Sequence, residues 1–309
     1  MDDAVFHDGP RIPCSDHSHD CVLGVCYTST ASGVTWREGA SMGTTYAVVN
    51  QKGGVGKTTT AVNIAAYTAL AGARTLLVDS DAQANATSGV GVDRSSIGLS
   101  TYSVLVESAS VSSAAVPTCI PGLSLLPATM DLAGADIELM PRISRESFLR
   151  RALDPVRSDY DVILIDAPPS LGLLTLNALV AAEALLIPIQ TEYYALEGMS
   201  QLINTIELVK AHLNPQLEIA KVILTMFDHR TRIARQVAEE VRAHFKELVA
   251  RTTIPRNVRL TESPSHGQPI ALYDPRSLGA AAYKAVAEEV LQHAKARSRK
   301  GSFRTHPAA

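Results

Sequence analysis

The sequence predicts one α/β domain, in which a twisted, mostly parallel β-sheet is covered by helices on both faces. Three observations support this class. An apolar stretch from Tyr46 turns through a glycine-rich loop and continues into a helical pattern. Two short apolar runs, 74–79 and 161–166, each end in an aspartate and have the length of buried parallel strands. Alanine and valine dominate the apolar content, which suits parallel strands beneath closely packed helices.

The bulk composition is that of one large domain. The chain has 309 residues, 46% of them hydrophobic, and a formal net charge of −3. We expect the domain to span 44–294, between an N-terminal extension at 1–43 and a basic, flexible tail at 295–309. The sequence has no window of 18 apolar residues and no signal-peptide pattern. We therefore expect a cytoplasmic protein that does not bind membranes.

Residues 1–43 differ in composition from the rest of the chain. They contain three of the four cysteines together with three histidines, so a zinc site is one interpretation. The spacing of Cys14, Cys21 and Cys26 lacks the C-x2-C unit of common zinc sites. A disordered tail is the interpretation that we favour. Met42, just before the first predicted strand, also allows that this segment precedes the working protein.

The glycine-rich loop has the residue types that hold phosphate groups. Its end matches the G-K-[ST] end of the phosphate-loop pattern of P-loop NTPases. Glycines let backbone N–H groups approach phosphate oxygens, and the following helix adds its positive end. We expect Lys57 to contact the β- and γ-phosphates, Thr58 to bind Mg²⁺ and Thr59 to contact the α-phosphate. The predicted nucleotide site comprises Lys52, Gly53, Gly54, Val55, Gly56, Lys57, Thr58 and Thr59.

Lys52 departs from the ordinary pattern, whose first glycine is replaced by Gln51. A lysine at this point has no role in its own phosphate cradle. One interpretation is that it contacts a phosphate bound by a facing subunit, as an arginine finger does in trans. The other is a solvated lysine beside a chance glycine turn.

The run K-G-G-V-G-K-T-T at 52–59 resembles the deviant Walker A motif of the ParA/MinD group of ATPases. Later motifs resemble the chromosomal ParA (Soj) branch, and the resemblance extends from Met42 to about His293. It implies a P-loop NTPase fold with ATP and Mg²⁺ as ligands. It also implies an ATP-dependent homodimer in which Lys52 contacts the partner's phosphates.

Two aspartates beyond predicted strands are candidate catalytic or metal-binding groups. Asp81 follows the strand that ends at Asp79, at the edge where α/β sheets bind ligands. It is a candidate for orienting the attacking water or for holding Mg²⁺ through water, and the alternative is a helix N-cap. The resemblance matches Asp81 to the family's hydrolytic aspartate. Ala82 replaces the usual proline, which should loosen this segment locally.

Asp166 ends an apolar run that is followed by Ala167-Pro168-Pro169, a Walker B pattern. The run alone is common, but after a phosphate loop it predicts a carboxylate in the Mg²⁺ shell. Beyond it, we expect the helix at 171–181 to lie at a subunit interface.

The resemblance also implies residues that contact the adenine. In the family, the segment that begins at Ile254 encloses the base, which places Pro255 and Asn257 in the site. Met226, directly after the strand predicted at 220–225, is a further candidate. The last predicted helix runs from Leu278 to His293.

Basic residues gather in the C-terminal half, although the whole chain is slightly acidic. Between Lys221 and Arg259 there are nine Lys/Arg and four Asp/Glu. This surplus suits sequence-independent contacts with DNA phosphates, and the alternative is a solvated face of the helix predicted at 233–249. ParA-type proteins bind DNA through basic residues in this half, so the resemblance favours DNA. The candidate contacts are Arg230, Arg235, Lys246 and Arg259.

The resemblance therefore implies a DNA-partitioning ATPase. The ATP-bound dimer would bind double-stranded DNA non-specifically on the nucleoid, and a ParB/Spo0J-type protein would stimulate slow hydrolysis and release. The sequence leaves open whether a chromosome or a plasmid is served. The alternative is a MinD-like, membrane-associated division-site ATPase. That function needs a C-terminal amphipathic helix, whereas the segment 295–303 offers only Phe303 as a large apolar residue.

Overall fold

The structure is a computed structural model that describes residues 43–192 and 197–302, without the side chains of 197–198 and 300–302. Most of the predicted N-terminal extension, with the zinc hypothesis for its cysteines, lies outside the described residues. The same holds for residues 303–309.

Seven strands of the described chain form one sheet in the order β3-β4-β2-β5-β1-β6-β7. Neighbouring strands are parallel except β3 and β4, which confirms the predicted, mostly parallel sheet. The strands are β1 (Thr44–Val48), β2 (Thr75–Asp79), β3 (Val116–Pro117), β4 (Leu123–Leu126), β5 (Val162–Asp166), β6 (Ala184–Gln190) and β7 (Glu218–Thr225).

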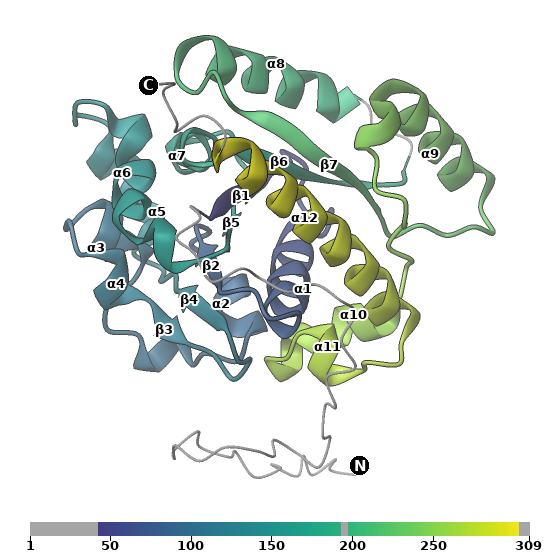
Figure 1. Ribbon diagram of the computed structural model, residues 1–309, viewed down its shortest axis with the longest axis horizontal. Helices are drawn as coiled ribbons and strands as arrows, with labels where there is room; N and C mark the ends of the chain where they lie inside the picture. Colours follow the sequence, from purple (N-terminus) through teal and green to yellow (C-terminus); the bar gives the residue numbers. More distant parts are fainter. Residues whose placement is uncertain (1–42, 193–196, 303–309) are drawn as a thin grey trace, which may run out of the picture. The chain divides into compact units, whose positions relative to one another are not determined.

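Helices cover both faces of the sheet, as Figure 1 shows, with α1 and α12 lying side by side. The first face carries α1 (Lys57–Leu70), α2 (Asn85–Gly89), α10 (Val258–Glu262), α11 (Ile270–Tyr273) and α12 (Leu278–Ser302). The second carries α3 (Thr101–Leu105), α4 (Val111–Ala114), α5 (Leu132–Leu139), α6 (Phe148–Leu153), α7 (Leu173–Ala181), α8 (Glu197–His212) and α9 (Arg232–Phe245). Single 3₁₀ turns lie at Arg94–Ser96, Arg145–Ser147, Asp154–Asp159, Lys246–Leu248 and Ser263–His266.

Side-chain alternation along the strands produces two hydrophobic cores. In β1, Ala47 contributes to the core on the α7 side, whereas Tyr46 and Val48 contribute to the core on the α1 side. In β5, Ile163 and Leu164 divide in the same way. Every residue of β5 is buried, because helices cover both faces of the strand. This burial explains why the run lacks the polar alternation of a half-exposed strand.

Two predicted helix ends are wrong. The last helix continues beyond His293 to Ser302, through the first part of the predicted tail. Residues 294–300 contain no proline or glycine and are rich in Ala, Lys and Arg, which favour helix. The helix predicted at 233–249 ends at Phe245, because Lys246 has a positive φ of 50°. Lys246 therefore lies in a 3₁₀ turn and not on the helix that carries Arg242.

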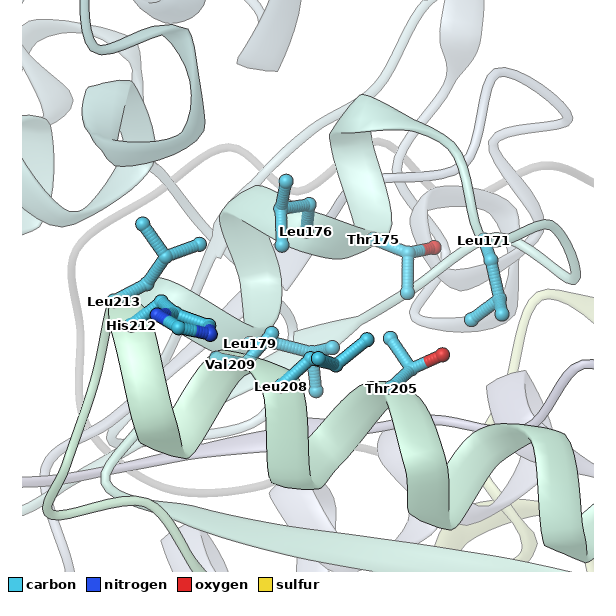
Figure 2. Close-up of a pocket in the computed structure, with 9 residues that line it drawn as sticks. All are labelled: Leu171, Thr175, Leu176, Leu179, Thr205, Leu208, Val209, His212 and Leu213. Atoms are coloured by element: carbon cyan, nitrogen blue, oxygen red, sulfur yellow. The ribbon is translucent and has the colours of Figure 1, made fainter.

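An apolar groove of about 500 Å³ runs between α7 and α8 (Figure 2). Leucines dominate its lining, with His212 and two threonines as its polar members. None of the residues predicted to bind a nucleotide lines this groove, so it is separate from the candidate site at the glycine loop.

Candidate nucleotide site

The sheet topology brings the predicted phosphate loop and both acidic strand ends together. The loop, residues 49–56, connects central β1 to α1, and β5 lies directly beside β1. On the other side of β5 lies β2, where Asp79 is in register with Asp166. The carboxyl ends of these parallel strands form one edge, the usual ligand position in open α/β sheets.

The loop is shaped by glycine conformation and anchored from a distant strand. Gly54 and Gly56 have φ values of 75° and 88°, which residues with a Cβ rarely adopt. The Thr225 hydroxyl at the end of β7 donates to the Val55 carbonyl oxygen at 2.8 Å. This bond ties the phosphate loop to the end of β7. No local sequence pattern marks Thr225, because the contact joins positions 170 residues apart.

Lys57 lies at the first position of α1 with its side chain turned back along the loop. Its ammonium donates to the Lys52 carbonyl oxygen at 3.1 Å. Burial lowers the pKa of the Lys57 ammonium, and the carboxylates of Asp166 and Asp81 oppose that shift. The ammonium is thus a buried cation near two acids, at the place where the pattern predicts phosphates.

Asp166 is fully buried, and neither of its carboxylate oxygens has a hydrogen-bond partner among the described residues. Burial raises the pKa of Asp166 well above its usual value, and the charge of neighbouring Asp79 raises it further. The nearby Thr58 hydroxyl opposes this shift without meeting the geometry of a hydrogen bond. A buried carboxylate without partners favours a nearby cation.

Asp79 anchors the segment that carries Asp81, although no motif in the sequence assigned Asp79 to the site. It accepts hydrogen bonds from the Thr87 amide at 2.8 Å, the Thr87 hydroxyl at 2.7 Å and the Asp81 amide at 3.2 Å. Burial raises the pKa of Asp79 to about 6, although these bonds oppose the shift. Only its position at the end of a buried strand marked it in the sequence.

Asp81 is half-buried and does not cap a helix. Its carboxylate accepts from the Gln83 amide at 3.0 Å, and α2 begins only at Asn85 with Ala84 as its N-cap. The alternative interpretation of Asp81 as a helix N-cap is therefore wrong. The carboxylate belongs to a turn beside the phosphate loop, which leaves its second oxygen for another partner.

The donor set fits a nucleotide with Mg²⁺ better than a metal alone. No group of three His, Cys, Asp or Glu residues in the described chain is placed to hold a metal ion. The loop offers glycine amides, a buried ammonium and the Thr58 hydroxyl, and the partnerless Asp166 lies beside them. Mg²⁺ commonly takes few protein ligands and completes its shell with phosphate and water. Thr58, Asp81 and Asp166 are the residues that would hold it.

Comparisons with known proteins give the same assignment. A family model described as an AAA domain matches residues 43–219. The sporulation initiation inhibitor protein Soj of Bacillus subtilis is 56% identical, covering 81% of this chain and 98% of Soj. The chromosome partitioning protein ParA of Myxococcus xanthus is 53% identical, covering 82% of this chain and 89% of ParA. The chain belongs to the Soj/ParA family.

A solved structure supports the fold of this Soj/ParA member. The Mycobacterium smegmatis protein named cobyrinic acid a,c-diamide synthase, with bound ADP and magnesium, matches with a TM-score of 0.73. It is 40% identical, and the match covers 83% of this chain and 97% of that one. The match confirms the P-loop NTPase fold.

The lysine typical of the Soj/ParA motif, Lys52, lies at the rim of the loop. Its amide donates to the Asn50 side chain at 3.0 Å, and Asn50 in turn donates to the Pro188 carbonyl oxygen at 2.7 Å. Its ammonium lies 3.4 Å from a carboxylate oxygen of Glu192. Asn50 therefore links the backbone of Lys52 to β6, while the Lys52 side chain reaches the surface.

The segment predicted to enclose the base lies against the end of β7. Pro255 forms an isolated bridge with Phe227, which follows Met226. Met226 has a φ of 51°, an uncommon backbone conformation for a residue other than glycine. Asn257 caps α10 by accepting from the Arg259 amide at 2.8 Å. These three candidates thus converge on one corner of the Soj/ParA fold.

The four basic candidates are all exposed, but they differ in their partners. The Arg230 guanidinium donates two hydrogen bonds to the Asp228 carboxylate and its amide donates a third, and these bonds hold the pKa of that carboxyl well below its usual range. Arg259 lies 2.9 Å from Glu262 and 3.5 Å from Asp274. Arg235 and Lys246 have no ion pair within the described ranges. Exposed ion pairs are weak, so all four remain available to phosphates.

Proposed function

We propose that this chain is an ATP-hydrolysing DNA-partitioning protein that acts as an ATP-dependent dimer. The observation that carries the proposal is Lys52 at the rim of a phosphate loop, in a chain 56% identical to Soj. Lys57, Thr58 and Thr59 bind the phosphates from the N-terminus of α1. Met226, Pro255 and Asn257 enclose the adenine. The catalytic domain begins at residue 44 and includes α12.

Hydrolysis transfers the γ-phosphoryl group of ATP to water and yields ADP and phosphate. Asp81 orients the attacking water, and Lys57 offsets the negative charge on the phosphoryl oxygens. Mg²⁺, held beside Thr58, Asp81 and Asp166, supplies further charge neutralisation. Lys52 contacts the phosphates bound by the partner subunit, so the complete site forms only in the dimer. We therefore expect slow hydrolysis by the chain alone.

The DNA interface comprises Arg230, Arg235, Lys246 and Arg259, which contact phosphates without reading bases. Pairing two subunits doubles these contacts, so the dimer binds far more tightly than the monomer and with steeper salt dependence. A ParB/Spo0J-type protein stimulates hydrolysis and releases the DNA. This cycle places the protein on the nucleoid in the cytoplasm. No helix in the described ranges has the length and apolar content to cross a membrane.

Binding to a non-specific DNA duplex tests this proposal. We expect binding with ATP and Mg²⁺, and much weaker binding with ADP or without nucleotide. Lys52→Ala should abolish ATP-dependent binding because pairing fails. Arg259→Glu should weaken it at least tenfold while leaving pairing intact. The measurement is fluorescence anisotropy across a salt series, with dimerisation followed by sedimentation.

Arg276→Glu, which reverses an exposed arginine outside the predicted interface, serves as the matched control for Arg259→Glu. Hydrolysis of ATP without DNA binding in any nucleotide state would contradict the partition function. Binding to vesicles would then be examined, since a MinD-like function predicts it.

A further inference from the structure

The Lys52 side chain is not free at the loop rim but is paired with Glu192, which lies just beyond the end of β6. Its ammonium lies 3.4 Å from Glu192 Oε2, although 140 positions separate the two residues. The side chains of Lys52 and Glu192 are 39% and 49% exposed, so water reaches both. The pair is therefore weak enough to open, because exposed ion pairs contribute little to stability.

Glu192 is held in place by groups other than Lys52. Its amide donates to the Gln190 carbonyl oxygen at 2.9 Å, and the Gln190 side chain donates to Oε1. The preceding Thr191 amide donates to the Thr225 carbonyl oxygen at 3.3 Å, next to the anchor of the phosphate loop. The Glu192 carboxylate is thus held at the end of β6 by contacts that do not depend on Lys52.

A second cation lies on the other oxygen of the same carboxylate. Arg256 is 3.8 Å from Glu192 Oε1 and stands between Pro255 and Asn257 in the predicted adenine segment. Glu192 therefore retains a cationic neighbour when Lys52 leaves. Breaking the Lys52–Glu192 pair therefore does not leave the carboxylate unpaired, so the free-energy cost of moving Lys52 away is small.

The ion pair with Glu192 competes with the role proposed for Lys52. To contact phosphates on a facing subunit, the Lys52 ammonium has to turn away from Glu192. We propose that Glu192 is a positioning residue that retains Lys52 on its own subunit and thereby opposes ATP-dependent pairing. This inference rests on the proposed function. Glu192 also places negative charge near the phosphates that the partner presents, which opposes pairing in the same direction.

Glu192→Gln tests the inference, because glutamine keeps the size of the side chain and removes its charge. Each exposed pair changes an equilibrium by up to about fivefold, and a dimer releases two such pairs. We therefore expect the dimer dissociation constant to fall, by up to about 25-fold. The measurement is sedimentation velocity of the full chain with Mg²⁺ and AMPPNP, a non-hydrolysable ATP analogue. A purely structural role for Glu192 would weaken the dimer instead.

Glu207→Gln is the matched control. Glu207 is an exposed glutamate that pairs with Lys210 at 3.7 Å on α8, far along the chain from the loop. The Glu207→Gln substitution should leave the dimer dissociation constant unchanged, and both variants should bind ADP with the affinity of the wild type. The inference is overturned if the dimer dissociation constant of Glu192→Gln is equal to or higher than that of the wild type. A wild type that stays monomeric with AMPPNP and Mg²⁺ overturns the proposed function itself.

Discussion

At the residue scale, the buried surroundings of Asp166 disfavour its charged form. It is fully buried, lacks a hydrogen bond in the described structure, and lies in register with a second buried aspartate, Asp79. Burial and the charge of Asp79 both raise the pKa of Asp166. The ionised form of Asp166 is therefore destabilised in the free chain, and a cation beside Thr58 would relieve this.

Asp166→Asn should stabilise the free chain, because it removes this buried charge with little change in shape. In a chain of this size, each kcal/mol shifts the melting temperature by about 2–4 °C. The same variant should lose the extra stabilisation that Mg²⁺ adds to ADP binding. Thermal unfolding with ADP, with and without Mg²⁺, measures both effects. A lower melting temperature for the free variant would contradict this account.

The pH dependence provides the internal control. An acid whose folded pKa is raised binds more protons folded than unfolded, so stability falls as pH rises between the two pKa values. The advantage of Asp166→Asn should therefore vanish near pH 4 and grow toward neutral pH. An advantage of Asp166→Asn that is as large at pH 4 as at pH 7 would contradict this account.

Local residue patterns predicted the phosphate loop but not the pairs that complete the site. Lys57, Thr58 and Asp166 follow motifs with fixed spacing and were expected at one edge. Asp79 became significant only through strand order. Its register partner Asp166 lies 87 positions later in the sequence, but their strands β2 and β5 are neighbours in the sheet. Glu192 joins Lys52 through the exposed end of β6, which no local pattern marks.

At the level of elements, α2 and the turn after α10 approach through two glycines. A Cβ on Gly91 would lie 2.8 Å from the Gly267 carbonyl oxygen, and one on Gly267 would lie 3.1 Å from Gly91 Cα. Both glycines also have positive φ values, 82° and 62°. This contact joins the segment that follows Asp81 to the segment that follows Arg259.

Gly91→Ala should destabilise the chain by at least about 1–2 kcal/mol, the cost of a left-handed conformation for a residue with a Cβ. The close backbone oxygen adds to this cost because it cannot move aside as a side chain can. Denaturant unfolding measures the loss. Gly98→Ala is the control, since a Cβ there meets nothing within 4 Å. Equal stability of the two variants would show that the contact relaxes freely.

Element boundaries were predicted less well than elements. The strands at 162–166 and 75–79 were placed correctly, since apolar runs with terminal acids are distinctive. The end of α9 depends on the positive φ of Lys246, which its residue type does not favour. The extension of α12 beyond His293 agrees with the helix propensity of 294–300, and the Arg297–Glu218 pair, which no local pattern marks, adds to it.

At the scale of the whole molecule, the length of α12 moves the C-terminal end of the folded domain beyond residue 294. Ala294 is 2% exposed in the core on the α1 side, and Arg297 pairs with Glu218 at the start of β7. His293 also lies 3.3 Å from Glu218, and its ring accepts or donates a hydrogen bond with Tyr46 at 2.8 Å. The helix as far as Arg297 therefore belongs to the packed structure and not to a tail.

A chain ended at His293 should be less stable than one ended at Ser302. The shorter chain loses the buried Ala294 side chain and the Arg297–Glu218 pair, together worth about 1–2 kcal/mol. We expect its melting temperature to fall by roughly 2–8 °C. The chain ended at Ser302 should match the full-length protein, and so should a chain that begins at Gly43. If removal of 1–42 lowers the melting temperature as much as removal of 294–309, the N-terminal segment belongs to the folded domain, and the boundary proposed at residue 44 is wrong.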